Sequence, residues 1–83
     1  MTRIELSEKF KNQIKKIKDE TVIDRVKNEF KALLKYPTLG KPLRYSLKGF
    51  RSVRIGKYRL IYVIEGDVVK IYAFEHRKGV YKG

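Results

Sequence analysis

The sequence predicts a single α+β domain, in which a pair of helices packs on one face of a mostly antiparallel sheet of four to five strands. Two observations favour this class. Apolar residues recur at helical spacing from residue 8 to about 35, and then at every second position as far as residue 76. The 83 residues are enough for one hydrophobic core and too few for two. Residues 1–83 are therefore expected to form one domain.

The N-terminal segment predicts a short strand followed by a helix. Residues 2–6 alternate polar and apolar side chains, as in a half-buried strand. Ser7 has a side chain suited to an N-cap. Apolar residues then recur on one helix face from Phe10 to Ile17, while lysines occupy the other side. We expect an amphipathic helix near residues 8–18.

A second helix is predicted almost at once. Thr21 and Asp24 have the spacing of a capping box, so we expect this helix to begin near Thr21. An apolar stripe then extends to about residue 35 and contains Val22, Val26, Phe30 and Leu33. The two helices should therefore form a hairpin.

The rest of the chain predicts a loop and a meander of strands. Residues 36–43 contain Pro37, Gly40 and Pro42, which disfavour both helix and strand, and form the main crossing loop. Strands are expected at about 44–47, 51–55, 58–64 and 68–76. The dipeptides that separate them all suit tight hairpins: Lys48-Gly49, Gly56-Lys57 and Gly66-Asp67.

A two-residue loop at Gly56-Lys57 determines how the strands on either side pair. It places Arg54 directly opposite Arg59. Like charges in this position destabilise a sheet, so the pair favours an anion between the two guanidinium groups. The alternative is that the two arginines extend separately into solvent or bind separate carboxylates. We call the side of the sheet from which both project the arginine face.

The same rule at Gly66-Asp67 predicts the register of the last two strands. Arg59 should lie opposite Phe74, and His76 should project from the arginine face. This face is expected to carry Ser52, Arg54, Arg59, Lys70, Tyr72 and His76. The opposite face is expected to carry the apolar residues Val53, Ile55, Leu60, Tyr62, Ile64, Val69, Ile71 and Ala73, which suit contact with the helices. A three-residue loop at either turn would exchange the faces of one strand.

The charge of the chain indicates a polyanionic or acidic partner. Lysine and arginine number 21 against 9 acidic residues, which gives a net charge of +12. The first 30 residues carry 8 basic and 6 acidic side chains, and the others carry 13 and 3, so most of the excess lies on the predicted strands. Nucleic acid or an acidic protein is expected, and a lysine-rich surface that serves only solubility is the alternative. Interleaved basic and aromatic residues on the arginine face favour single-stranded nucleic acid.

The composition also excludes several classes of protein. With no cysteine and one histidine, the chain should have no disulfide, no metal ion and no other cofactor. No apolar run approaches the roughly 20 residues of a membrane span, and the first residues lack the apolar run of a signal peptide. We therefore expect a cytoplasmic protein without membrane contact.

Four segments of the chain resemble the RelE/ParE superfamily of toxins. They are Lys41-Pro42-Leu43, Leu47-Lys48-Gly49-Phe50, Arg54-Ile55-Gly56-Lys57-Tyr58-Arg59-Leu60-Ile61-Tyr62 and His76-Arg77-Lys78-Gly79-Val80-Tyr81. The most specific part is the run from Arg54 to Tyr62, followed by a strand that ends in His76-Arg77. The resemblance covers essentially the whole chain. It implies a RelE-like fold and the toxin of a type II toxin–antitoxin system.

The resemblance to the RelE-like branch implies metal-independent endonucleolytic cleavage of mRNA on the ribosome. It also implies inhibition by a cognate RelB-like antitoxin, with which the toxin can form a heterotetramer. Four residues would be catalytic: Arg59 and Arg54 would stabilise phosphate charge, His76 would act as acid or base, and Tyr81 would orient the base or assist proton transfer. Further RNA or phosphate contacts are expected from Lys48, Arg51, Ser52, Lys57, Lys70, Arg77, Lys78 and Lys82.

Two departures from the family pattern affect the implied mechanism. Lys41-Pro42-Leu43 contains no acid, whereas the YoeB-like branch carries a glutamate in this loop. Ser52 stands where some RelE toxins have a lysine. Both departures place more of the proton transfer on His76. The alternatives are a ParE-like gyrase inhibitor without nuclease activity, and an inactive basic RNA-binding module.

Overall fold

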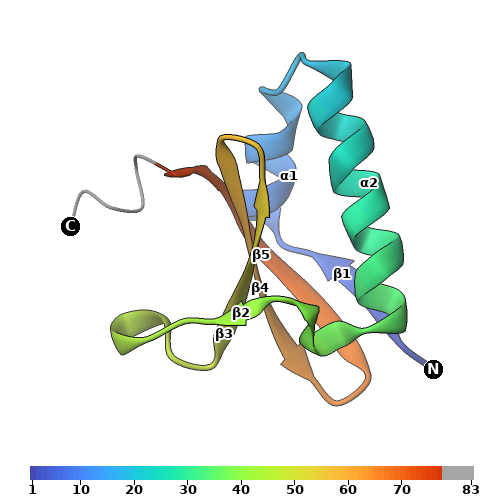
Figure 1. Ribbon diagram of the computed structural model, residues 1–83, viewed down its shortest axis with the longest axis vertical. Coiled ribbons are helices and arrows are strands. Elements are labelled where there is room, and N and C mark those ends of the chain that lie inside the picture. The colour runs from blue at the N-terminus through green and yellow to red at the C-terminus, as the bar shows by residue number, and fades with distance from the viewer. Residues whose placement is uncertain (78–83) are drawn as a thin grey trace.

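The structure, a computed structural model, describes residues 1–77 as a five-stranded mixed sheet with two helices on one face (Figure 1). The strands are β1 (Arg3–Leu6), β2 (Lys41–Pro42), β3 (Phe50–Ile55), β4 (Tyr58–Glu65) and β5 (Val68–His76). Their order is β1-β5-β4-β3-β2, and all neighbours are antiparallel except β1 and β5. The predicted α+β class is confirmed.

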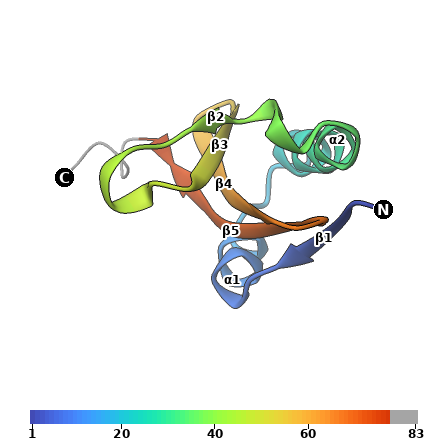
Figure 2. The same ribbon diagram turned by 90° about the horizontal axis from the view of Figure 1, so that it is seen from below.

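Helices α1 (Glu8–Lys15) and α2 (Glu20–Lys35) form the predicted hairpin on the same side of the sheet (Figure 2). Ser7 caps α1, because its Oγ accepts a hydrogen bond from the Phe10 N–H at 3.0 Å. α1 is shorter than predicted. Ile17 lies beyond its end and still packs against the core from the connection between the helices. The helical spacing of apolar residues in the sequence therefore extends beyond the end of the helix itself.

The N-cap of α2 is Asp19, so the predicted capping box at Thr21 was wrong. Asp19 Oδ1 accepts hydrogen bonds from the Thr21 backbone N–H at 2.9 Å and from the Thr21 hydroxyl at 2.6 Å. The bond from the Thr21 side chain, followed by the one from its backbone, lowers the pKa of the Asp19 carboxyl. Aspartate caps a helix at least as well as threonine, and its negative charge suits the positive end of the helix dipole.

The hairpin between β3 and β4 forms as predicted. Gly56 adopts a positive φ of 57°, which glycine can do without steric cost. Arg54 pairs with Arg59, and Val53 pairs with Leu60. The predicted register of β3 and β4 is therefore confirmed.

A β-bulge interrupts the predicted register of β4 and β5. Tyr62 pairs with Ile71 as expected, but Ile61 pairs with Ala73. Tyr72 is therefore an extra residue in β5. Because side chains alternate along a strand, the insertion moves Ala73 from the predicted apolar face to the arginine face.

The bulge also changes the partners of the residues that follow it. Arg59 lies opposite Glu75, so the predicted pairing of Arg59 with Phe74 was wrong. His76 lies opposite Tyr58 and therefore does not share the register face of Arg59. The bulge falls within a continuous run of strand-forming residues, which contains no turn signal to reveal it.

α1 closes the edge of β5 beyond the end of β1. The pairing of β1 with β5 ends at Ile71. The Ser7 hydroxyl then donates to the Tyr72 carbonyl at 2.6 Å, and Gln13 Oε1 accepts from the Phe74 N–H at 2.7 Å. These two bonds hold the backbone of β5 on both sides of Ala73.

The hydrophobic core lies between the helices and the sheet. Its buried residues are Phe10, Val26, Leu33, Ile55, Leu60, Tyr62, Val69, Ile71 and Phe74. Every residue of the predicted apolar face except Ala73 packs in this core or against it. The bulge places Phe74 on the helix side of the sheet, where it joins these core residues.

The segment between α2 and β3 differs most from the prediction. The strand expected at residues 44–47 was wrong, because Tyr45–Leu47 is a short 3-10 helix in which Tyr45 has a φ of 60°. The strand that pairs with β3 is Lys41–Pro42, inside the predicted loop. Pro42 is tolerated there because β2 is an edge strand.

Tyr62 anchors this segment to the core. Its fully buried hydroxyl donates to the Pro37 carbonyl at 2.7 Å and accepts from the Gly40 N–H at 2.8 Å. A Cβ atom at Gly40 would lie 2.6 Å from the same hydroxyl, so only glycine fits. Arg51 Nη1 donates to the carbonyls of Gly40 at 2.8 Å and Thr38 at 3.3 Å. The long crossing segment is thereby held at one end of the sheet.

Candidate nucleic-acid interface

Arg54 and Arg59 lie opposite each other near the tip of the β3–β4 hairpin. Their strand neighbours pack in or against the core, so by alternation both arginines project from the sheet face away from the helices. The two-residue turn makes Ile55 and Tyr58 a hydrogen-bonded pair. The next pair, Arg54 and Arg59, is then of the closer type, with Cα atoms roughly 4.5 Å apart. Arg54 is exposed and Arg59 is half-buried. Two guanidinium groups are thus placed within reach of one phosphate.

Two other predicted contacts, Ser52 and Lys70, also lie on the arginine face. Ser52 pairs with Ile61 across β3 and β4 and is half-buried. Lys70 Nζ lies 2.8 Å from Glu65 Oε1, and this hydrogen bond, with the charge of the carboxylate, raises the pKa of Lys70. Since Glu65 already compensates part of its charge, Lys70 is a weaker anion ligand than the arginines.

The structure does not bring Arg51 and His76 together with the arginine pair. Arg51 lies opposite Tyr62, and its guanidinium holds the carbonyls of the crossing segment. The prediction that His76 projects from the arginine face was wrong, because the bulge places it opposite Tyr58. Its exposed ring meets the ring of Tyr58 edge to face, with centroids 5.5 Å apart. His76 remains near the hairpin tip, one position along the ladder from Arg59 and on the other register face.

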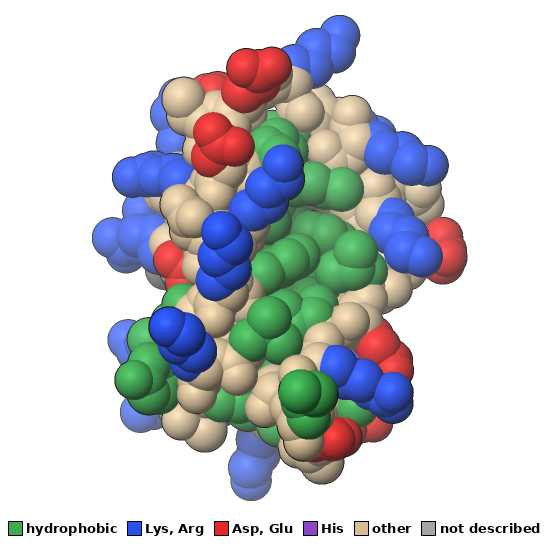
Figure 3. All heavy atoms as spheres, turned by 90° about the vertical axis from the view of Figure 1, so that its right-hand side faces the viewer, with side chains coloured by type: hydrophobic (Ala, Val, Ile, Leu, Met, Phe, Trp, Pro, Cys, Tyr) green, Lys and Arg blue, Asp and Glu red, His purple; other side chains and the backbone are tan. Residues whose placement is uncertain are grey.

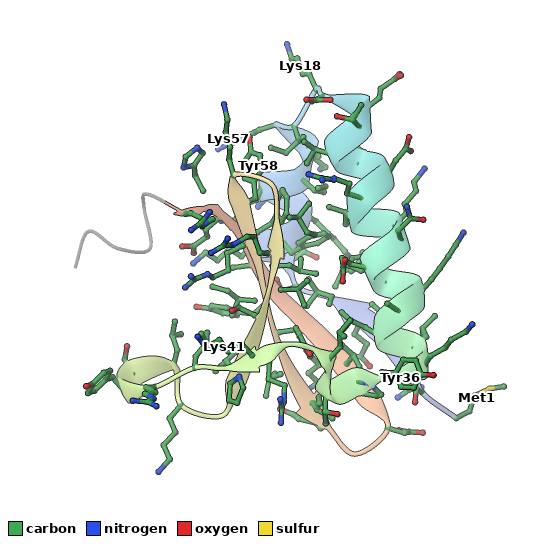
Figure 4. All side chains as sticks on the ribbon, in the orientation of Figure 1. Met1, Lys18, Tyr36, Lys41, Lys57 and Tyr58 are labelled. Carbon is green, nitrogen blue, oxygen red and sulfur yellow. The ribbon has the colours of Figure 1, made fainter. Side chains whose placement is uncertain are left out.

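Three further predicted contacts lie at the hairpin tip or in the loop before β3. Lys57 extends away from the tip (Figure 4), and Lys48 is exposed in the loop. The Arg77 N–H donates to the Lys57 carbonyl at 2.8 Å, which joins the end of β5 to the tip. Arg77 Nε is buried without a hydrogen-bond partner among residues 1–77. Three predicted residues, Lys78, Tyr81 and Lys82, lie outside the described residues.

Phe50 is a member of the arginine face that the sequence prediction missed. It pairs with Val63, two positions before Ser52 on β3. Its ring centroid lies 5.2 Å from that of Tyr72. The alternation of Phe50, Ser52 and Arg54 along one strand was the signal that would have placed it there.

A second surface lies on the side of the molecule formed by α2 and the N-terminal strand. Figure 3 shows a strip of hydrophobic side chains there, with lysine and arginine side chains on both sides. The half-buried apolar residues of these elements and α1 include Ile4, Ile14 and Phe30, and Leu34 of α2 is 42% exposed. Exposed lysines recur at every fourth position of α2 and therefore form one ridge: Lys27, Lys31 and Lys35.

Neither a membrane span nor a metal cluster is found in the described part of the chain. Within residues 1–77 no helix is long and apolar enough to cross a membrane. The same residues contain no group of three or more His, Cys, Asp or Glu side chains that could hold a metal ion.

Comparison with known proteins relates the chain to toxins. Residues 4–81 match the family described as ParE toxin of type II toxin-antitoxin system, parDE. No curated protein matches the chain by sequence. Among solved structures, a chain of the toxin–antitoxin complex RelBE2 from Mycobacterium tuberculosis is 29% identical, with a TM-score of 0.80, and the match covers 92% of this chain and 98% of that one.

Two more distant structures share the fold. A chain of the YoeB–YefM complex from Staphylococcus aureus is 19% identical, with a TM-score of 0.80 and coverage of 93% of this chain and 98% of that one. YafQ from Escherichia coli is 22% identical, with a TM-score of 0.69 and coverage of 98% and 99%.

Proposed function

The chain belongs to the ParE toxin family of type II toxin–antitoxin systems, and we propose that this toxin acts by cleaving messenger RNA on the ribosome. The observation that carries the proposal is the Arg54–Arg59 pair on the arginine face. Glu75 lies opposite Arg59 on β5 and can compensate one of the two charges, and an anion bound between the arginines is required to compensate the other. A phosphate of single-stranded RNA meets that requirement, and the net charge of +12 favours its approach.

The proposed reaction needs no group beyond those of the protein and the RNA. The ribose 2′-oxygen attacks the adjacent phosphorus, and the bond from phosphorus to the 5′-oxygen of the next nucleotide breaks. The 2′-hydroxyl loses a proton to an acceptor, and the leaving 5′-oxygen gains one, so the products are a 2′,3′-cyclic phosphate and a 5′-hydroxyl. Arg59 and Arg54 stabilise the negative charge that develops on the phosphate oxygens, where one such donor contributes roughly 10²- to 10³-fold in rate.

Proton transfer is assigned to His76, because histidine can take up or release a proton near neutral pH. Its exposed ring lies at the end of β5, opposite Tyr58 and on the other register face from Arg59, so the RNA must pass around the hairpin tip to meet both groups. Tyr81 is proposed to assist at the same phosphate. Activity in the presence of a chelator would test the metal independence of this reaction.

The proposed partner is a cognate antitoxin whose amphipathic helix binds the hydrophobic strip beside α2. The strip would bury the apolar face of such a helix, and the Lys27, Lys31 and Lys35 ridge would meet acidic residues along its edge. RelBE2 and YoeB–YefM were solved as toxin–antitoxin complexes, and one YoeB–YefM complex is a heterotetramer. These structures support an antitoxin complex, with the same assembly, for this cytoplasmic toxin.

The second candidate is inhibition of DNA gyrase without RNA cleavage, favoured by the ParE description of the matching family. Two assays separate the candidates. Primer extension on mRNA in a purified translation system should show new 5′ ends when the toxin is added, and a gyrase supercoiling assay should show no inhibition. The reverse pattern would establish the gyrase inhibitor. Tight RNA binding with neither effect would indicate an inactive RNA-binding module.

A further inference from the structure

Two aromatic rings meet on the arginine face beside the bulge in β5. As the extra residue, Tyr72 turns its side chain to the same side as Ala73, away from the core. Phe50 reaches the same place from β3, so the two rings meet across β4, with centroids 5.2 Å apart and planes inclined by 57°. Lys9 Nζ lies 5.0 Å from the centre of the Tyr72 ring and 3.2 Å from Glu75 Oε1. The ring of Tyr72 is thus held in position while remaining 39% exposed.

A small apolar hollow lies between these rings and β1. Its volume is about 230 Å³, and it is lined by Glu5, Leu6, Ser7, Phe50, Val63, Lys70, Ile71 and Tyr72. This volume lies well above the roughly 10–15 Å³ that one water molecule needs by the same measure, and below the roughly 300 Å³ at which pockets for whole small molecules begin. A single planar ring system is a suitable occupant.

The position of the hollow indicates what kind of ring would bind. It lies on the same sheet face as Arg54 and Arg59, and Phe50 precedes Arg54 by four residues on β3, a distance of about 13 Å along the strand. The lining contains a carboxylate, Glu5, and an ammonium group, Lys70. These groups can accept from an amino group and donate to a carbonyl or ring nitrogen. Nucleobases present such edges, and their faces stack on aromatic side chains.

We propose that the hollow beside Phe50 and Tyr72 binds one unpaired nucleobase of the RNA strand whose phosphate lies at Arg54 and Arg59. This inference rests on the proposed function and adds the site that would select a base near the cleaved bond. The base stacks against the exposed ring of Tyr72, and Phe50 supports that ring from the side. Glu5 and Lys70 contact its edge and favour some bases over others.

The experiment measures binding of the full-length toxin to a fluorescently labelled single-stranded RNA. The RNA carries 2′-O-methyl groups, which block attack by the 2′-oxygen, so binding is observed without cleavage. Tyr72→Leu and Phe50→Leu remove the rings and keep apolar bulk. Tyr36→Leu is the matched control, because Tyr36 is 67% exposed at the end of α2, away from the arginine face. Thermal unfolding of each variant confirms that it is folded.

We expect each ring variant to bind the RNA roughly 5- to 100-fold more weakly, the range for loss of one stacked base, and the control to bind within about twofold of the original protein. When the bases of the RNA are removed one at a time, removal at one position should lower the affinity as much as Tyr72→Leu does. Tyr72→Leu should bind the RNA that lacks this base no more weakly than the original protein does, because the missing base and the missing ring remove the same contact.

The other outcomes overturn the inference and leave the proposed function separately testable. If Tyr72→Leu and Phe50→Leu bind RNA like the control, the hollow is not a base site, even if mRNA cleavage persists. If they bind RNA normally but lose affinity for the antitoxin, the hollow takes an apolar side chain of the partner. If the unaltered toxin does not bind the RNA, the base site is likewise excluded. If binding depends on both rings but the toxin does not cleave unmodified mRNA in the translation system, the base site is supported and the nuclease is overturned.

Discussion

Arg54 and Arg59 face each other directly across β3 and β4, although both side chains are positively charged. No packing requirement explains this pairing, since neither residue belongs to the core. An opposed pair of like charges lowers the stability of a sheet, by an amount comparable to the roughly 0.2–1 kcal/mol that a favourable cross-strand pair contributes. Glu75 lies opposite Arg59 on β5 and can compensate one of the two charges, so the arrangement suits a site at which one further anion binds.

The first prediction is that Arg59→Ala abolishes mRNA cleavage without unfolding the protein. The variant loses the charge that stabilises the transition state. It loses the repulsion with Arg54 and also the opposite charge across from Glu75, so the free energy of unfolding should change by less than about 1 kcal/mol. Arg54→Ala should have a smaller effect. Primer extension and thermal unfolding measure the two properties. Lys31→Ala is the matched control, because it removes one positive charge from exposed α2. Wild-type cleavage by Arg59→Ala would exclude the proposed role.

The second prediction is that His76→Gln slows the cleavage step by about 10²- to 10⁴-fold and leaves RNA affinity unchanged. Glutamine keeps a polar side chain opposite Tyr58 but cannot exchange a proton near neutral pH. Single-turnover cleavage, with binding measured separately, distinguishes the two effects. A variant that cleaves at the original rate would remove His76 from the mechanism. The position of His76 opposite Tyr58, off the arginine face, would then explain why the substitution has no effect on cleavage.

The third prediction concerns the buried hydroxyl of Tyr62. Tyr62→Phe should lower the free energy of unfolding by about 1–3 kcal/mol, because it leaves the Gly40 N–H and the Pro37 carbonyl without their partner. Urea unfolding measures the change. Tyr36→Phe is the control and should change stability by less than about 0.5 kcal/mol, since Tyr36 is 67% exposed. Equal stability of the two variants would show that the hydroxyl does not hold the crossing segment.

The fourth prediction is a loss of stability at alkaline pH that depends on Tyr62. Burial is the largest cause that raises the pKa of this phenol, so the folded protein holds the proton more tightly than the unfolded chain does. Its contribution should be complete below about pH 10, the ordinary pKa of tyrosine, and should be lost as the pH rises through the raised value. Tyr62→Phe should show a flatter decline than the original protein. Parallel unfolding curves at alkaline pH would contradict this.

The fifth prediction locates the antitoxin. Leu34→Glu introduces a charge on an α2 residue beside the hydrophobic strip and should weaken antitoxin binding at least tenfold, while mRNA cleavage by the free toxin is unchanged. Calorimetry with the antitoxin and primer extension measure the two activities. Tyr45→Glu is the control, because Tyr45 is 91% exposed in the short 3-10 helix before β3 and belongs to neither α1 nor α2. Equal antitoxin affinity of both variants would place the partner elsewhere.

Local interactions explain what could be predicted from the sequence. The cap at Ser7 joins residues only three positions apart. The Arg54–Arg59 pairing follows from a two-residue turn, so the candidate phosphate site was predictable before the fold was known. Alternation along β3 and β4 then placed the core residues on one face. Local chemistry failed where two caps compete, since Asp19 and Thr21 both have suitable side chains, and at residues 44–47, which form a 3-10 helix in place of a strand.

Only the tertiary structure decided the features that depend on distant residues. The bulge at Tyr72 is held by Ser7 and Gln13, which α1 brings to the edge of β5 from more than 60 residues away. That one extra residue moves Ala73 to the arginine face and His76 away from it. Side chains alternate along a strand with a period of two, so the sequence alone assigned each residue of β3, β4 and the first part of β5 to one face of the sheet. The contacts of α1 with β5 determined where the alternation shifts, and with it which residues complete the arginine face.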